Sequence, residues 1–255
     1  MTISVTDLHA SGVSLVPYAS SDYTSLAAAA VSPSVAAAIQ PLLLYSAFVA
    51  NKTALPILAC TVSWAMVDKT GTPFTNYQTF FDPISLAPAV LPDGAILATV
   101  MGSINTPGVE KNQQILNELA AQASLLQSQA SVTISLEAVM FVDGSTIGRD
   151  TSLSMAQTRA RMRSEYDLYT AVLQKATDTP TDSAFISWLQ ALANALPPGA
   201  KLSFSMDPFP TWYKFYQARL ARELVNFASQ RTVQEMVAFV QKAFVTKQYP
   251  PLVIN

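Results

Sequence analysis

Histidine and cysteine are almost absent from this chain of 255 residues, which contains only His9 and Cys60. A single cysteine excludes an internal disulfide and any metal site built from several cysteines. A catalytic Ser-His or Cys-His pair could be built only with His9, which lies in a polar N-terminal segment without a clear pattern. We therefore expect no metal centre and no catalytic role for His9.

Charged residues are also scarce, at 13% of the chain, and the formal net charge is -2. This share is about half of what soluble domains usually carry. The only dense basic group is Arg159, Arg161 and Arg163, whereas neutralising a nucleic-acid backbone requires clustered lysine and arginine. We therefore expect no nucleic-acid partner. The uncharged surface leaves apolar area that could contact another protein or a second copy.

The eight glycines are dispersed and form no phosphate-binding loop, so we expect no cofactor. The uncharged run 23–50 is interrupted by Pro33, Gln40 and Pro41, which argues against a membrane span. No secretory signal is visible between Met1 and Ser14. The composition, low in charge and rich in serine, threonine and glutamine, is more typical of an exported protein, and a cytoplasmic location is the alternative.

The stretch 42–68 organises the predicted fold. It reads as two strands, 42–50 and 56–67, joined by a polar break at 51–53. In the second strand the larger side chains alternate with small ones, which predicts a core face with Trp64 as its largest member and Cys60 as a small hydrophobe. Before these strands, Ser32 and Pro33 predict the start of a short helix.

Further strands follow at 77–81, 95–101 and 131–147, separated by turn residues. Between the last two, apolar residues at helical spacing among glutamine and asparagine predict an inserted helix within 109–129. After residue 148 the pattern becomes helical. Four apolar stripes, within 155–173, 185–196, 212–227 and 233–244, predict four helices that bury these stripes.

The segment ILACTVSWAMVDKTG, the later FVDGSTIG and the arginine-bearing helix that follows resemble uncharacterised bacterial proteins with an Ig-like sandwich. The resemblance covers about the middle third of the chain and implies a fold but no activity. We predict an α+β fold: an antiparallel Ig-like β-sandwich with an inserted helix and a C-terminal helical part packed on it. The expected divisions are an N-terminal lead-in with a short helix (1–40), the β-sandwich domain (41–150) and the helical part (151–255).

Three groups of residues are candidates for ligand binding. Glu137 falls inside an apolar strand; it either points to solvent or pairs with an arginine such as Arg149. Arg159 and Arg163 share a helix face and could hold an anion, although local pairs with Glu165 and Asp167 explain them as well. The third group is an aromatic cluster that could bind carbohydrate or peptide, and that otherwise fills a core. Its members are Phe209, Trp212, Tyr213, Phe215 and Tyr216.

The missing catalytic constellations favour a non-catalytic binding or structural module whose ligand is unknown. One alternative is a hydrolase acting on carbohydrate or another neutral polymer through scattered acids and an aromatic cleft. Another is a self-assembling protein that associates through its apolar surface or an unpaired sheet edge. A pocket with two carboxylates would favour the enzyme, and a flat aromatic patch would favour binding.

Overall fold

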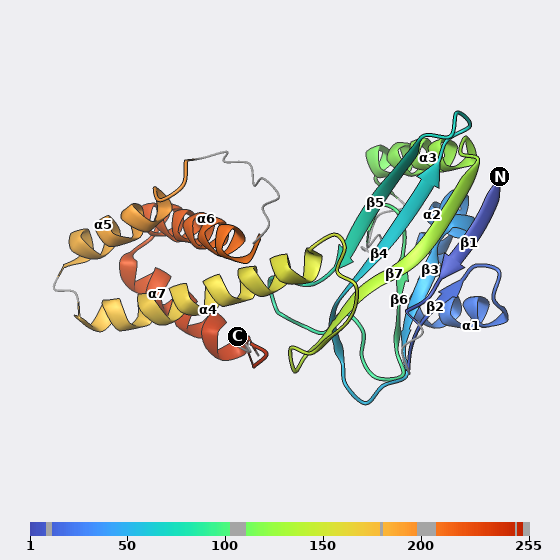
Figure 1. Cartoon of the computed structure of the whole chain (residues 1–255). Helices are drawn as coiled ribbons and strands as arrows, with labels where there is room; N and C mark the ends of the chain where they lie inside the picture. Colours follow the sequence, from blue (N-terminus) through green and yellow to red (C-terminus); the bar gives the residue numbers. More distant parts are fainter. Residues whose placement is uncertain (9–11, 103–110, 179–180, 198–207, 248, 252–255) are drawn as a thin grey trace. The chain divides into compact units, whose positions relative to one another are not determined.

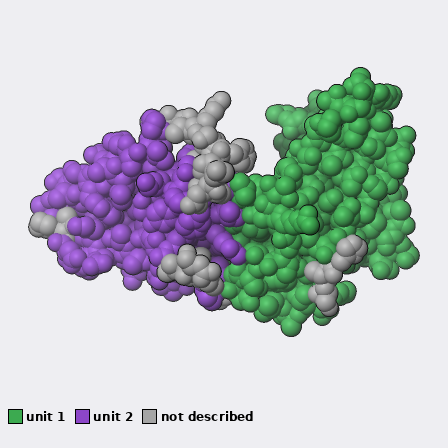
Figure 2. Space-filling model, viewed as in Figure 1, with its two compact units in different colours: residues 1–82, 87–155 green, residues 83–86, 156–255 purple. Residues whose placement is uncertain are grey.

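The computed structural model describes residues 1–8, 12–102, 111–178, 181–197, 208–247 and 249–251. The chain divides into two compact units (Figure 2): unit 1 comprises residues 1–82 and 87–155, and unit 2 comprises residues 83–86 and 156–255. The described strands all lie in unit 1, and unit 2 is helical. The predicted α+β class is therefore confirmed.

A mixed sheet of five strands dominates unit 1 (Figure 1). Its main order is β1-β7-β4-β5, and β8 pairs with β7. The β1 strand is parallel to β7, and the remaining pairs are antiparallel. The strands are β1 (Thr2–Thr6), β4 (Ile57–Val67), β5 (Pro73–Phe80), β7 (Ser131–Phe141) and β8 (Thr146–Gly148).

A second, antiparallel sheet has the order β2-β3-β6 and shares one hydrophobic core with the first sheet. Its strands are β2 (Val13–Pro17), β3 (Ala47–Asn51) and β6 (Ala95–Ala98). Helical segments of unit 1 contribute to the same core: α1 (Ser21–Ala30), α2 (Pro33–Ile39), the 3-10 helix η1 (Gln40–Tyr45) and the inserted α3 (Gln113–Gln127). The Ser32 cap and Pro33 start of α2 are confirmed. Residues 1–40 supply two strands and two helices to this unit.

The prediction of one strand over 42–50 was wrong in its first half. Residues 42–45 end the 3-10 helix, which carries Leu42 and Tyr45 into the core, and the strand starts at Ala47. The two organising strands also lie in different sheets, because β4 pairs with β5 and β7 while β3 pairs with β2 and β6. In the residues that the structure describes, the strands form two sheets that do not show an Ig-like sandwich.

The polar break after β3 is a turn closed by Asn51. The Asn51 side-chain oxygen accepts hydrogen bonds from the Thr53 backbone N–H (3.0 Å) and from the Thr53 hydroxyl (2.7 Å), and its amide donates to the Leu55 carbonyl (2.9 Å). Asn51 itself is buried. This segment ends β3 and lets the chain cross from one sheet to the other.

Two bulges interrupt the alternation on which the strand prediction rested. The register between β4 and β7 shifts at Leu58 on one strand and at Glu137 on the other. Each bulge adds one residue, so side chains beyond it change faces. As a result Ile57 and Val139 belong to the core cluster, although simple alternation places both on the opposite face. Trp64 and Cys60 lie in the core as predicted.

Unit 2 consists of the predicted four helices, with a core of their own. They are α4 (Ser154–Asp178), α5 (Asp182–Ala193), α6 (Pro208–Gln230) and α7 (Val233–Thr246). Thr181 caps α5, and Thr232 with Glu235 forms a reciprocal capping box that starts α7. None of the helices in the described ranges has the length and apolar character needed to cross a membrane. Packing of these helices on the β part stays a prediction.

Gly148 should be indispensable where β8 meets the bulge. It has φ +93°, and a Cβ at this position would overlap the Glu137 carbonyl oxygen. We expect Gly148→Ala to destabilise the protein by about 3 kcal/mol, measured by urea unfolding. Gly71 is the matched control, because its φ is similar (+89°) but its Cβ would meet nothing within 4 Å. Gly71→Ala should cost only the backbone term of about 1 kcal/mol; equal losses for the two variants would contradict this account.

Candidate functional site

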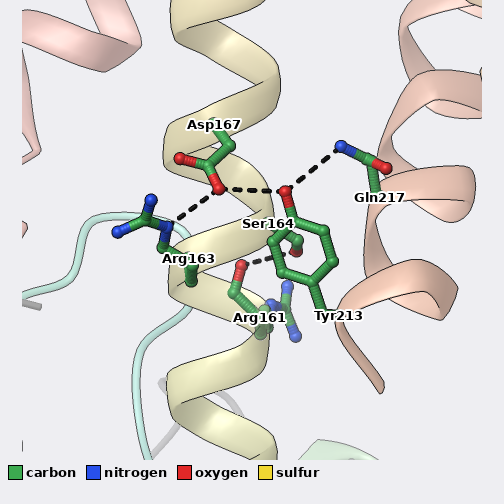
Figure 3. Close-up of polar contacts among 6 residues, drawn as sticks. All are labelled: Arg161, Arg163, Ser164, Asp167, Tyr213 and Gln217. Atoms are coloured by element: carbon green, nitrogen blue, oxygen red, sulfur yellow. Dashed lines mark hydrogen bonds and ion pairs between the residues drawn. The ribbon is translucent and has the colours of Figure 1, made fainter. Parts of the chain in front are cut away.

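Two of the predicted binding residues meet in a polar cluster between α4 and α6 (Figure 3). The Arg163 Nε donates to the Asp167 carboxylate at 2.8 Å, one helical turn further along α4. The Tyr213 hydroxyl, from α6, donates to the same carboxylate oxygen at 2.9 Å, and Gln217 lies 3.4 Å from this hydroxyl. The cluster therefore pairs Arg163 with a local acid, as the alternative interpretation predicted, and joins two helices.

A second set of contacts joins α4 to α6 through Tyr216. The Gln157 side-chain amide donates to the Tyr216 hydroxyl at 2.6 Å, and the Arg161 guanidinium lies over the Tyr216 ring, 5.6 Å from its centroid. Arg159 is exposed on α4. Because Arg161 and Arg163 have separate partners, the three arginines do not converge on one point.

Burial raises the pKa of Tyr213 to about 12. The hydrogen bond to Asp167 and the charge of that carboxylate act in the same direction, whereas Arg163 opposes them. The geometry explains the raised pKa, because loss of the Tyr213 phenol proton would break the hydrogen bond that links α6 to Asp167 on α4. The cluster thus holds Tyr213 neutral at ordinary pH as a hydrogen-bond donor.

The aromatic candidates at the start of α6 are divided between core and surface. Trp212 and Tyr216 are buried, and Tyr213 and Phe215 are partly buried. Phe209 is 38% exposed and stacks on Tyr213, with 6.3 Å between ring centroids. Most members of this cluster are therefore buried or partly buried. A binding role for Phe209, Tyr213 and Trp212 stays a prediction.

Glu165 and Lys247 form an ion pair that sequence reasoning missed. Both side chains are buried, and the Lys247 ammonium also lies 3.3 Å from the Pro83 carbonyl oxygen. This contact ties residues 83–86 to the helical unit. A signal was present in the sequence, because Glu165 falls at helical spacing with Met162, Tyr169 and Val172 on the buried side of α4. Removing one partner of such a pair leaves an uncompensated charge, so the pair fixes this end of α7.

Two tyrosines surround this ion pair. Tyr169 and Tyr249 both have a raised pKa, mainly because they are buried and secondly because the Glu165 carboxylate lies nearby. Tyr249 also packs edge-on against Tyr166, with ring centroids 5.4 Å apart. Residues around Glu165 therefore bind the segment after α7 to α4, and they act as a structural contact.

Glu137 lies in unit 1, at the bulge of β7. Its carboxylate accepts hydrogen bonds from the Ser63 hydroxyl (2.6 Å) and the Thr151 hydroxyl (3.2 Å), and its backbone carbonyl accepts from the Arg149 N–H (2.9 Å). The main-chain bond to Arg149 is not the predicted pairing of the Glu137 carboxylate with an arginine side chain, since the carboxylate is bonded to the two hydroxyls. Both carboxylate oxygens have hydroxyl partners, so Glu137 anchors the chain after β8 to the sheet.

The remaining candidates add no catalytic constellation. His9 lies outside the described residues. Within the described part, no three of the histidine, cysteine, aspartate and glutamate side chains are grouped to hold a metal. Burial raises the pKa of the Cys60 thiol to about 12, which makes it unreactive at ordinary pH.

Comparison with protein-family models, with curated proteins and with solved structures finds no match to this chain. The resemblance to bacterial proteins with an Ig-like sandwich therefore stays a prediction.

The Tyr213 cluster predicts a pH dependence of stability. The pKa of Tyr213 in the folded protein lies above its unfolded value of about 10. The stabilisation that the protonated Tyr213 hydroxyl provides is therefore complete below pH 10 and is lost as pH rises towards 12. We expect wild-type stability to fall over this window and Tyr213→Phe to show a weaker fall, because it has no proton to lose. Urea unfolding at pH 8, 10 and 11 measures both. The other tyrosines contribute equally to both proteins, so identical pH profiles would refute the assignment.

Proposed function

We propose that this chain is a non-catalytic binding or interaction module. The observation that supports the proposal is that the three carboxylates described above are used in bonds within their own units. Asp167 binds Arg163 and Tyr213, Glu165 binds Lys247, and Glu137 binds two hydroxyls. A catalytic acid or base needs a free lone pair or proton directed at a substrate, whereas these groups hold helices and strands together.

The alternative, a hydrolase of carbohydrate, has Glu137 as its best acid. Glycoside hydrolysis requires two carboxyl groups on either side of the scissile bond. The neighbours bonded to the Glu137 carboxylate are the uncharged Ser63 and Thr151. These partners suit a structural carboxylate better than one half of an acid pair. The resemblance to uncharacterised bacterial proteins with an Ig-like sandwich implies a fold and no activity, so it does not separate the two functions.

The experiment is a turnover assay with the purified chain. We expect no release of reducing ends from a panel of neutral polysaccharides, and no difference between wild type and Glu137→Gln, which keeps the size of the side chain. Turnover by wild type that disappears in Glu137→Gln would contradict the proposal of a non-catalytic module and support the hydrolase. Circular dichroism of both proteins checks that the variant is folded.

Self-association is a second candidate function, and the β5 strand favours it. This strand ends the five-stranded sheet and pairs with β4 without a bulge over Pro73–Phe80. It has no charged residue, and its one proline is its first residue. Proteins usually protect an edge strand with charges, internal prolines or bulges. An unprotected edge of eight residues can pair antiparallel with the same strand of a second copy.

Phe74 provides the test of this second candidate. It is 41% exposed on β5, and symmetric pairing would bring two copies of the strand together. We expect concentration-dependent dimers for wild type and monomers for Phe74→Lys, since a lysine on an edge strand opposes its pairing with another strand. Analytical ultracentrifugation measures both. Leu91→Lys, at a 61% exposed position outside the strand, is the control and should still dimerise. A wild type that stays monomeric at all concentrations would remove this candidate.

A further inference from the structure

One face of the five-stranded sheet is covered with hydroxyl side chains in register. Strand pairing aligns residues of β1, β7, β4 and β5 in rows across the sheet. One row is Ser4, Thr133, Ala65 and Thr75, and the next is Thr6, Ser135, Ser63 and Tyr77. Thr2 and Ser131 precede these rows, while Thr61 and Thr79 follow them. We call this set the hydroxyl face.

The hydroxyl face is open on its flanks. Its residues on β1 and β5 are exposed and those on β7 are partly buried, whereas Ser63 and Thr61 on the central β4 are buried. Strand spacing of about 4.8 Å places β1 about 14 Å from β5. In the row of Ser4, Thr133, Ala65 and Thr75, exposed or partly exposed side chains continue across all four strands.

The face has no charge along these rows. Solvated faces of antiparallel sheets commonly carry polar residues of every kind, but here hydroxyls replace the lysine and glutamate that a surface usually displays. The Glu137 carboxylate lies at one end of the face, where the Ser63 hydroxyl is bonded to it. An uncharged face gives no attraction to nucleic acid or to charged peptides.

Tyr77 adds an aromatic ring to the same face. It is opposite Ser63 in the strand register and is 36% exposed. An exposed tyrosine ring offers a flat apolar surface with a polar tip. Hydroxyls that both donate and accept, next to such a ring, match a ligand that has many hydroxyl groups and an apolar ring face.

We propose that the hydroxyl face binds a neutral polysaccharide, with Tyr77 stacking on a sugar ring and the serine and threonine hydroxyls bonding to sugar hydroxyls. This inference rests on the proposed function and gives its ligand class. The absence of charged side chains along these rows favours a neutral ligand, because a neutral polyhydroxyl chain loses no ion solvation on binding. The distance from β1 to β5 allows several sugar residues to contact the face at once.

Affinity electrophoresis and calorimetry with hydroxyethylcellulose, xyloglucan and amylopectin test the proposal, with polygalacturonate as the anionic comparison. We expect wild type to bind at least one neutral polymer and not polygalacturonate. Tyr77→Ala should weaken binding about 5- to 10-fold through loss of ring stacking. The double variant Thr75→Val and Thr133→Val removes two hydroxyls of one row without changing side-chain shape, and should weaken binding at least as much.

Two controls keep this test specific. Tyr18→Ala removes another exposed tyrosine of unit 1, and Thr24→Val removes an exposed hydroxyl on α1; both should bind like wild type. No binding of any neutral polymer, preference for polygalacturonate, or equal binding by all variants would overturn the inference. These results would leave the non-catalytic module intact, whereas turnover dependent on Glu137 would overturn that module instead.

Discussion

The pairing of β4 with β7 is the interaction on which unit 1 depends. It places Trp64 opposite Ile134 in the middle of the five-stranded sheet, where both side chains are fully buried. The Trp64 indole N–H donates to the Tyr45 carbonyl at 2.8 Å, which satisfies the polar atom of a ring that could not otherwise be buried without cost. Because Tyr45 ends η1, this hydrogen bond also holds the chain that leads into the second sheet.

The bulge at Glu137 shows how this pairing shapes the surface. One extra residue on β7 shifts the strand register between Val62 and Thr61 and brings Val139 into the core. The same shift directs the Glu137 carboxylate to Ser63 and Thr151. Gly148, whose lack of a Cβ permits the close approach of β8, completes the feature. The bulge thus ends the alternating hydroxyls on β7 and places the Glu137 carboxylate where two hydroxyls bond to it.

Periodicity predicted most of the fold, because long elements carry a strong signal. The buried strand around Trp64, the inserted helix and the four C-terminal helices were all visible as regular apolar patterns. The errors have physical causes. Pro41 and the residues after it form a 3-10 helix although they are as apolar as a strand, and a bulge such as that at Leu58 leaves no mark on composition.

The candidate site was harder to predict, since pairing partners far apart in the chain decide what a side chain does. The local pair of Arg163 with Asp167 was predictable from their spacing, but the hydroxyl of Tyr213, 46 residues further along, was not. Glu165 was read as a surface acid, although its position among the buried residues of α4 was a usable sign. The hydroxyl face could not be predicted from the sequence either, because its rows combine β1 with strands that begin more than fifty residues later.

A shortage of charge has opposite consequences inside and outside this protein. Inside, the few ionised groups are paired, because an unpaired charge in a buried site costs several kcal/mol; Glu165 with Lys247 is the clearest case. Outside, serine and threonine cover the sheet in place of lysine and glutamate, and their hydroxyls bond to each other, as Ser4 does to Thr133 at 2.9 Å. Such a surface can exchange its hydroxyl–hydroxyl hydrogen bonds for hydrogen bonds to a neutral ligand at little cost in free energy, whereas it has no opposite charge with which to attract an ion. The composition that leaves few ionised side chains in the described residues thus also produces the uncharged rows of the hydroxyl face, on which the proposed binding of a polyhydroxyl ligand rests.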